Sequence, residues 1–298
     1  MDSYPKLFIP GPTHVPDRIM RILSTPQIGH RTEEISDLIQ EIVLGVQDLL
    51  YTNNKIFLFS HAATGLWEMS LLNSVRTGIL HCVNGAFSSK WAHISDLYKY
   101  NSQILNYEWG KGIKASDIDP ILASGNFDVL AMVHNETSTG VMSSLDEISD
   151  MMKSKYPEVL WIVDAVSSMA GVKIDVDALG IDFLISSTQK AWGLPAGFSV
   201  CSVSDRMINR SKSMDNKGYF LDLLVYDKYM TKFQTPSTPS VPHLFGLREV
   251  LRIINAEGLE NRWKRHTEMR DHVIKWAEDH GQSLFSEPGY HSHTVTCI

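Results

Sequence analysis

Between residues 56 and 203 the chain repeats one arrangement, a short apolar run followed by a stretch of helical periodicity. The runs lack the alternation of apolar and polar residues that a half-exposed strand shows, so we expect strands that are covered on both faces. Strands that alternate with helices in this order predict a doubly wound α/β sheet with mostly parallel strands. The predicted strands are 56–60, 80–83, 129–134, 160–164, 183–186 and 198–203.

Helical periodicity is clearest in residues 32–51, which carry apolar side chains at the spacing of an amphipathic helix. Thr32 stands in the position of an N-cap, and Glu33 and Glu34 suit the positive end of the helix dipole. Further helices are predicted at 66–75, 144–155, 244–254 and 259–278.

Past residue 205 the repeated arrangement stops, and the proline-rich segment 234–242 precedes two long helical stretches. A chain of 298 residues is long enough for one large domain and part of a second. We therefore predict an N-terminal segment at 1–17, a large domain at 18–245 and, at 246–298, the start of a smaller α+β C-terminal domain.

Composition excludes several classes of protein. Of all residues, 43% are hydrophobic and 20% are charged, as in ordinary globular proteins. The net charge of −7 gives no electrostatic support for nucleic-acid binding. No apolar run approaches the roughly 18 residues that a membrane-spanning helix needs, and the first residues do not form a signal peptide. The three scattered cysteines include no CxxC pair and favour a reducing compartment, so we predict a cytoplasmic protein.

Two charged residues follow buried-looking strands. Asp164 ends one predicted strand and Lys190 follows another, and open α/β sheets bind their ligands at this edge. The carboxylate could hold the protonated pyridine nitrogen of pyridoxal 5′-phosphate (PLP), and the desolvated amine could form a Schiff base with the PLP aldehyde. Alone, Asp164 fits a cap of the next turn equally well, and a lone lysine in such a place is more often a surface residue.

Other predicted strand ends carry further groups that a PLP site needs. Residues 61–65, His-Ala-Ala-Thr-Gly, open a helix, and their small side chains and the Thr64 hydroxyl suit a phosphate. Phe87 could stack on a cofactor ring, and Thr137 could reach its phenolic oxygen. Each has an ordinary alternative, namely a strand-to-helix turn, a core phenylalanine or a polar turn. Together with the acid and the lysine, in order along one sheet, they predict a PLP site.

Several short segments match those of one known family. They are Pro-Gly-Pro-Thr (10–13), Gly-His-Arg (29–31), Ala-Thr-Gly (63–65), Asn-Gly-Ala-Phe (84–87), Glu-Trp-Gly (108–110), His-Asn-Glu-Thr-Ser-Thr-Gly-Val (134–141), Val-Asp-Ala-Val-Ser-Ser (163–168), Ser-Ser-Thr-Gln-Lys (186–190), Gln-Thr-Pro-Ser-Thr-Pro (234–239) and Glu-Gly-Leu-Glu-Asn-Arg (257–262). In these segments the chain resembles the class V aminotransferases of fold type I. This PLP-dependent group includes serine–pyruvate, alanine–glyoxylate and phosphoserine aminotransferases.

The resemblance implies a role for each matched residue. Lys190 would bind the cofactor aldehyde and then move the substrate α-proton, while Asp164 would hold the pyridine nitrogen. His30 and Arg31 would bind an anionic substrate side chain. The further cofactor-binding residues that it implies are Ala62, Ala63, Thr64, Phe87, Thr137, Val166, Gln189, Gln234 and Thr235. The last two would reach the phosphate of the neighbouring subunit, which implies a homodimer with shared active sites.

The implied reaction is ping-pong transamination. An amino group would pass from serine, phosphoserine or alanine to 2-oxoglutarate, pyruvate or glyoxylate. Members of the family run tens of residues further, through an arginine that clamps the substrate carboxylate, so we expect a truncated chain. The alternatives are a PLP lyase or cysteine desulfurase and a PLP-binding chain without turnover. A metal protein has little support, because the 12 histidines show no HxxxH or HExxH pattern.

Overall fold

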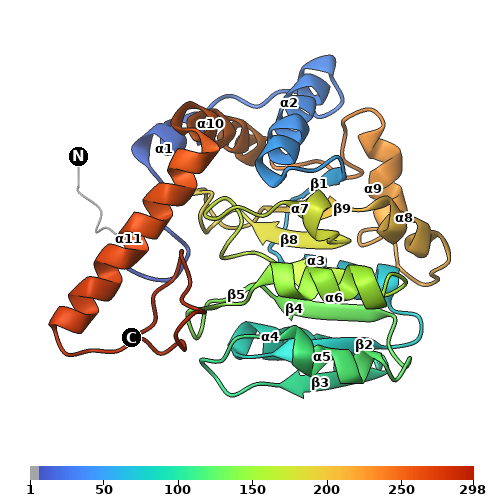
Figure 1. The fold of residues 1–298 in the computed structure, drawn as a ribbon. Coiled ribbons are helices and arrows are strands. Elements are labelled where there is room, and N and C mark those ends of the chain that lie inside the picture. Colours follow the sequence, from blue (N-terminus) through green and yellow to red (C-terminus); the bar gives the residue numbers. More distant parts are fainter. Residues whose placement is uncertain (1–6) are drawn as a thin grey trace.

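The computed structural model describes residues 7–298 and shows a central sheet with helices on both faces (Figure 1). Within these residues the main sheet has seven strands in the order β1-β9-β8-β7-β4-β2-β3. Strand β9 is antiparallel to both of its neighbours, and the other pairs are parallel. The strands are β1 (Lys55–Phe59), β2 (Ile79–Val83), β3 (Ser102–Asn106), β4 (Val129–Val133), β7 (Leu160–Asp164), β8 (Phe183–Ser187) and β9 (Ser199–Val203), with a separate hairpin of β5 (Asn135–Glu136) and β6 (Val141–Met142). This is the predicted doubly wound, mostly parallel sheet.

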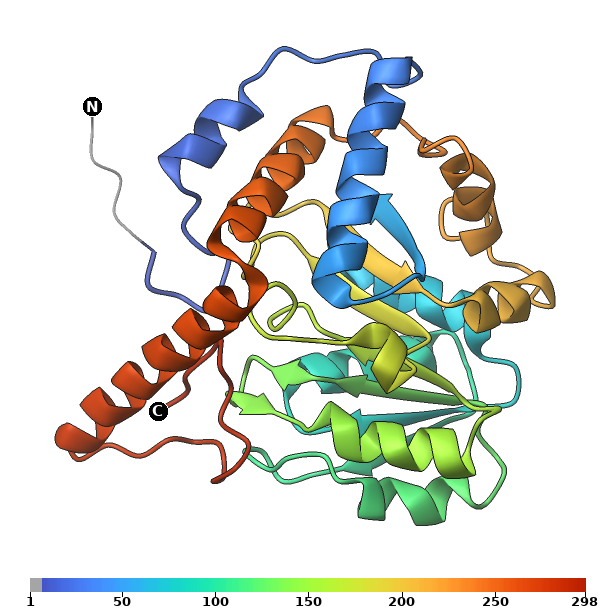
Figure 2. The same ribbon diagram turned by 45° about the horizontal axis from the view of Figure 1, so that its top comes forward.

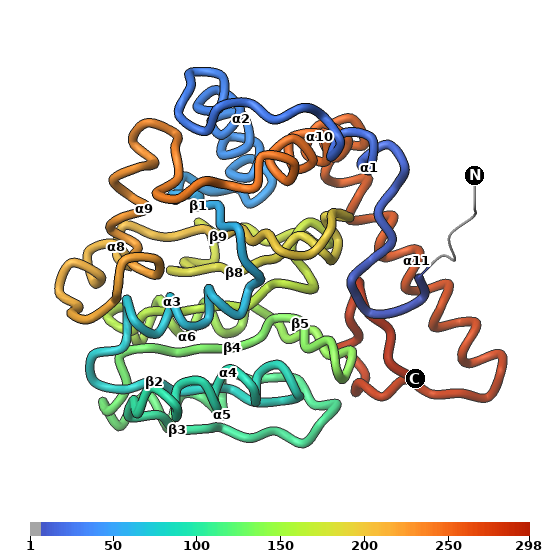
Figure 3. Tube along the Cα trace, turned by 180° about the vertical axis from the view of Figure 1, so that it is seen from behind, coloured from blue at the N-terminus to red at the C-terminus, as the bar shows by residue number. Residues whose placement is uncertain are grey.

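Helices cover the sheet in two layers, and the view from behind shows α3 and α4 on the face opposite α5 and α6 (Figure 3). The helices are α1 (Asp17–Leu23), α2 (Glu33–Leu50), α3 (Thr64–Ser74), α4 (Ala86–Leu97), α5 (Ala115–Leu122), α6 (Leu145–Lys155), α7 (Val176–Leu179), α8 (Asp205–Lys212), α9 (Leu223–Met230), α10 (Val241–Glu257) and α11 (Leu259–Asp279).

Burial on both faces explains why the strands are apolar without alternation. In β1, Ile56 and Leu58 join the core that is shared with α2 and α10. Their neighbours Phe57 and Phe59 point to the other face and join the core that contains residues of α3, α8 and α9. Strand β1 therefore contributes to two cores, as a strand covered on both faces of a doubly wound sheet does.

The six predicted strands are present, with each end within one residue of its predicted place. Strand β3 was not predicted, because this edge strand is partly exposed and lacks a continuous apolar run. The helix predicted at 32–51 spans Glu33–Leu50, and Thr32 occupies its N-cap position. The Thr32 hydroxyl donates to the Gly29 carbonyl instead, so its side chain does not cap the helix.

Helix α10 packs against α1 and α2, and α11 then leads away from the sheet (Figure 2). The predicted boundary at residue 245 falls inside α10, and the division into 18–245 and 246–298 stays a prediction. Of the predicted N-terminal segment 1–17, residues 1–6 lie outside the described part of the chain. From residue 7 onward, no helix combines the length and the apolar character that crossing a membrane requires.

The packing of α2 gives a direct test of the core. Ile42 is fully buried on this helix, whereas Leu44 on the same helix is 53% exposed. We expect Ile42→Ala to lower the free energy of unfolding by about 2–5 kcal/mol, since it removes buried methyl groups and leaves a cavity. Leu44→Ala should change it by less than about 1 kcal/mol. Urea denaturation followed by circular dichroism measures both, and equal losses would contradict this assignment of the buried face.

Candidate active site

The carboxyl ends of β1, β2, β4, β7 and β8 meet at one edge of the sheet, and the segments that follow them line a cavity of about 290 Å³. The predicted cofactor residues that line it are Ala62, Ala63, Thr64, Phe87, Thr137, Asp164, Val166, Gln189 and Lys190. The sequence analysis did not assign its other lining residues, which are Gly11, Pro12, Trp67, Val133, Asn135, Ser167 and Ala196. Side chains that are far apart in the sequence therefore share one site.

Asp164 is the buried acid of this site and is only 3% exposed. Its Oδ1 accepts a hydrogen bond from the Val166 N–H at 2.8 Å, and its Oδ2 accepts one from Trp67 Nε1 at 2.6 Å. Burial raises the pKa of this carboxyl to about 6, although both hydrogen bonds and the charge of Lys190 act in the opposite direction. A cation placed in the cavity would therefore be strongly favoured beside this carboxylate.

Lys190 lies under the N-terminal segment of the chain. Its Nζ donates to the Pro10 carbonyl at 2.9 Å, and Thr13 Oγ1 donates to the Lys190 carbonyl at 3.0 Å. Gly11 has a φ of +149°, and a Cβ at this position would overlap with Lys190 Nζ, so the segment can lie this close only with glycine there. Desolvation lowers the pKa of Lys190, with the nearby Asp164 charge opposing the shift.

The start of α3 forms another wall of the cavity. Residues 62–64 line it, and in the described part of the chain no side chain caps the N–H groups of this helix. An uncapped helix start favours an anion, because its N–H groups and its dipole both point toward the ligand. Gln189 also lines the cavity, and Ser187 Oγ donates to Gln189 Oε1 at 2.6 Å, which holds that side chain at the end of β8.

Glu136 connects two segments of the site, although the sequence analysis gave it no role. Its buried carboxylate accepts hydrogen bonds from the N–H and the hydroxyl of Ser88 at 3.0 and 2.9 Å, and from Ser138 Oγ at 2.7 Å. These contacts attach the loop that carries Thr137 to the start of α4, which carries Phe87. Only its position inside a turn full of polar residues could have marked this glutamate.

The remaining predicted site residues, which are His30, Arg31, Gln234 and Thr235, do not line this cavity. Arg31 Nη2 donates to the Pro236 carbonyl at 3.3 Å, and its guanidinium lies over the Tyr229 ring. Gln234 Nε2 lies 3.5 Å from Ser36 Oγ, at the start of α2. The segment with His30 and Arg31 is thus close to the segment with Gln234 and Thr235. Their proposed roles stay predictions.

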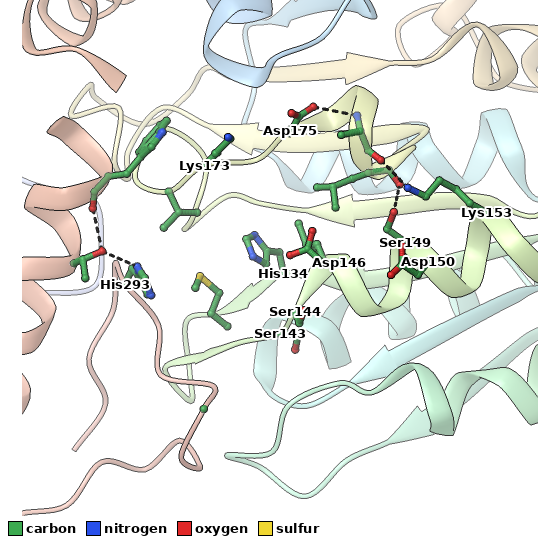
Figure 4. A pocket seen from close by; sticks show the side chains of 18 residues that line it. His134, Ser143, Ser144, Asp146, Ser149, Asp150, Lys153, Lys173, Asp175 and His293 are labelled. Atoms are coloured by element: carbon green, nitrogen blue, oxygen red, sulfur yellow. Dashed lines mark hydrogen bonds between the residues drawn. The ribbon is translucent and has the colours of Figure 1, made fainter. Parts of the chain in front are cut away.

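A second cavity, of about 710 Å³, is larger but differs in chemistry (Figure 4). Its polar side chains include His134, Asp146, Lys173 and His293, and none of the predicted cofactor residues line it. Burial lowers the pKa of His134 to about 3, and the nearby His293 adds to this effect. Within residues 7–298, no group of three or more His, Cys, Asp or Glu side chains is placed to hold a metal ion.

The donor set of the smaller cavity fits PLP. It provides a buried carboxylate for a protonated ring nitrogen, an amine with a lowered pKa for an aldehyde, and an uncapped helix start for a phosphate. None of these groups is specific to PLP by itself. The match to PLP comes from all three groups lining the same cavity.

Comparison with known proteins agrees with this chemistry. The family model described as Aminotransferase class-V matches residues 19–297. An uncharacterized aminotransferase of Methanocaldococcus jannaschii is 35% identical over 295 residues, which cover 97% of this chain and 76% of that protein. The serine–glyoxylate aminotransferase of Methylorubrum extorquens is 32% identical over 307 residues, which cover 98% and 76%.

Solved structures show the same relationship in three dimensions. The alanine–glyoxylate aminotransferase from Nostoc sp. superposes with a TM-score of 0.90 at 27% identity, over 100% of this chain and 82% of that one. A neighbour with such a TM-score has the same arrangement of strands and helices. The chain therefore belongs to the class V aminotransferases, PLP-dependent enzymes of fold type I.

Proposed function

We propose that this aminotransferase moves the amino group of a small L-amino acid, serine, phosphoserine or alanine, to glyoxylate, pyruvate or 2-oxoglutarate in a ping-pong reaction. The observation that carries the proposal is the single cavity that holds Asp164 and Lys190 together. The names of the relatives from Methylorubrum extorquens and Nostoc sp. favour serine or alanine as the donor and glyoxylate as the acceptor.

PLP, when bound, supplies an aldehyde and an electron-accepting ring. In our proposal the Asp164 carboxylate holds the proton of the ring nitrogen. Lys190 Nζ takes the α-proton from the substrate and later returns it, because a lysine with a lowered pKa is neutral more often than an exposed one. The chain from Pro10 to Thr13 lies against this lysine, because the Pro10 carbonyl accepts a hydrogen bond from Nζ and Thr13 Oγ1 donates to the Lys190 carbonyl.

The other lining residues would hold the cofactor in place. Ala62, Ala63 and Thr64, with Gln189, would bind the phosphate at the start of α3. Phe87 and Val166 would pack on opposite faces of the ring, and Thr137 would contact its phenolic oxygen. Their common position around one cavity supports these assignments.

We further propose a homodimer in which Gln234 and Thr235 of each subunit reach the phosphate site of the other. His30 and Arg31 would contribute to substrate binding. The position of both segments outside the cavity of their own subunit supports a role in the partner's site. In a dimer with twofold symmetry, each subunit would contribute these segments to the active site of the other.

The proposed substrates can be identified from the visible absorbance of the protein with PLP. Adding L-serine, L-alanine or L-phosphoserine separately should bleach the yellow band with at least one of them, because the first half-reaction consumes the cofactor aldehyde. D-Serine is the matched control and should leave the band unchanged. If the band forms but responds to none of the three, the proposed donor class is wrong.

Lys190→Ala should abolish the yellow band that dialysed protein retains, since this amine is the proposed attachment point of the aldehyde. Lys173→Ala removes an exposed lysine outside the 290 Å³ cavity and should leave the band unchanged. Absorbance after dialysis and the thermal unfolding of each variant provide the comparison. A band that persists in folded Lys190→Ala protein would assign the aldehyde to another residue.

Shared sites can be tested by mixing two defective variants. Lys190→Ala lacks the proposed amine, and the double variant Gln234→Ala with Thr235→Ala lacks the groups that are proposed to cross the interface. A mixed dimer would contain one complete site, so refolding the two chains together should restore PLP binding that neither variant shows alone. Absorbance at the yellow band measures the recovery. If mixing restores nothing although mixed dimers form, the two segments do not complete the partner's site.

A further inference from the structure

We propose that Trp67 is a positioning residue for the PLP site: its indole N–H fixes the Asp164 carboxylate and keeps it ionised for the ring nitrogen. The inference rests on the role proposed above for Asp164. Trp67 lies in the first turn of α3, after the small residues 62–65, and belongs to none of the cofactor-binding residues predicted from the sequence.

The contact itself is short and buried. Trp67 Nε1 donates to Asp164 Oδ2 at 2.6 Å, and Trp67 is only 4% exposed. The other oxygen, Oδ1, accepts the Val166 N–H at 2.8 Å. The two donors come from different parts of the fold and each holds one oxygen, so together they fix the plane of the carboxylate. Hydrogen bonds to a charged group are among the stronger ones in proteins.

The indole cannot easily turn away from the carboxylate. It stacks on Trp91 of α4 with ring centroids 5.9 Å apart and an interplanar angle of 13°. Trp91 in turn packs edge-on against His81 of β2, and Lys90 Nζ lies 5.9 Å from the centroid of the Trp67 ring. The buried Nε1 of Trp91 finds no hydrogen-bond partner among the described residues. The two stacked rings therefore differ in their hydrogen bonds: the Trp67 N–H donates to Asp164, whereas the Trp91 N–H has no acceptor within residues 7–298.

The electrostatic surroundings make this one donor important. Burial and the neighbouring Glu136 favour the neutral acid at Asp164, while the Val166 N–H, the Trp67 N–H and Lys190 favour the carboxylate. The resulting pKa of about 6 is close to neutral pH. Removing the indole N–H therefore raises the pKa, and the acid takes up its proton at a higher pH. Binding a protonated ring nitrogen then requires that this proton be released first.

The test compares the dissociation constants of PLP for apo-protein between about pH 8 and about pH 5.5, with Trp91→Phe as the matched control. The PLP dissociation constant of Trp67→Phe, divided by that of wild type, should be near one at high pH. It should rise toward about tenfold at low pH, because an increase of about one unit in the pKa of Asp164 has this effect. Trp91→Phe also removes an indole from the stack, but its ratio should not depend on pH. A ratio for Trp67→Phe that is equally flat, whatever its size, would show a packing role only and would overturn the proposal.

Asp164→Asn separates this inference from the role proposed for the acid. The amide does not titrate, so adding Trp67→Phe to Asp164→Asn should change the PLP dissociation constant by a factor independent of pH. A factor that still grows at low pH would mean that Trp67 acts through another group. If Asp164→Asn binds PLP as wild type does at every pH, the role proposed for Asp164 fails instead.

A measurement on the unmodified apo-protein keeps the proposal testable even if the variants do not fold. The chain has 7 tryptophans, and ¹⁵N labelling makes each indole N–H visible by nuclear magnetic resonance. One indole signal should shift with pH around a midpoint of about 6, because its acceptor loses charge as Asp164 takes up a proton. If no indole signal follows such a titration, the proposed hydrogen bond to an ionising Asp164 is wrong.

Discussion

The site depends on a carboxylate that the fold has taken out of water. Asp164 ends β7 in the middle of the sheet, and its burial raises the pKa of the carboxyl and favours the protonated acid. Each stabilising contact comes from a different part of the chain: the turn after β7, the first turn of α3, and the lysine that follows β8. Together these contacts stabilise the negative charge of the Asp164 carboxylate in apolar surroundings.

Parallel strands make this convergence possible. Their carboxyl ends all reach the same edge, so that the segments that follow successive strands meet there although they are far apart in the sequence. The apolar runs were enough to predict this sheet and its order of elements, because strands buried on both faces leave a continuous signal. The partly exposed edge strand β3 leaves no such signal, and it was missed for that reason.

The polar residues at the strand ends could also be predicted to share a site, because an acid, a lysine and a small-residue turn follow one another along one sheet, although each alone has an ordinary explanation. Trp67 and Glu136 were not predictable in the same way. A tryptophan on the buried face of a helix fits an ordinary core position, and only the tertiary structure shows that its N–H points at Asp164. Glu136 stands among polar residues, and its function as an anchor between two segments depends on α4 lying beside it. Such residues can be identified only from the three-dimensional structure, because their role depends on where the side chain points and not on the residue type.

The contact between Pro10 and Lys190 joins residues 180 positions apart, which has a consequence for biosynthesis. Pro10 leaves the ribosome long before Lys190, because the strands from β1 to β8 are translated between them. The Pro10 carbonyl must therefore remain without this contact until Lys190 has been made. The cofactor site cannot be assembled on a nascent chain that ends before residue 190, so acquisition of PLP must follow the translation of Lys190.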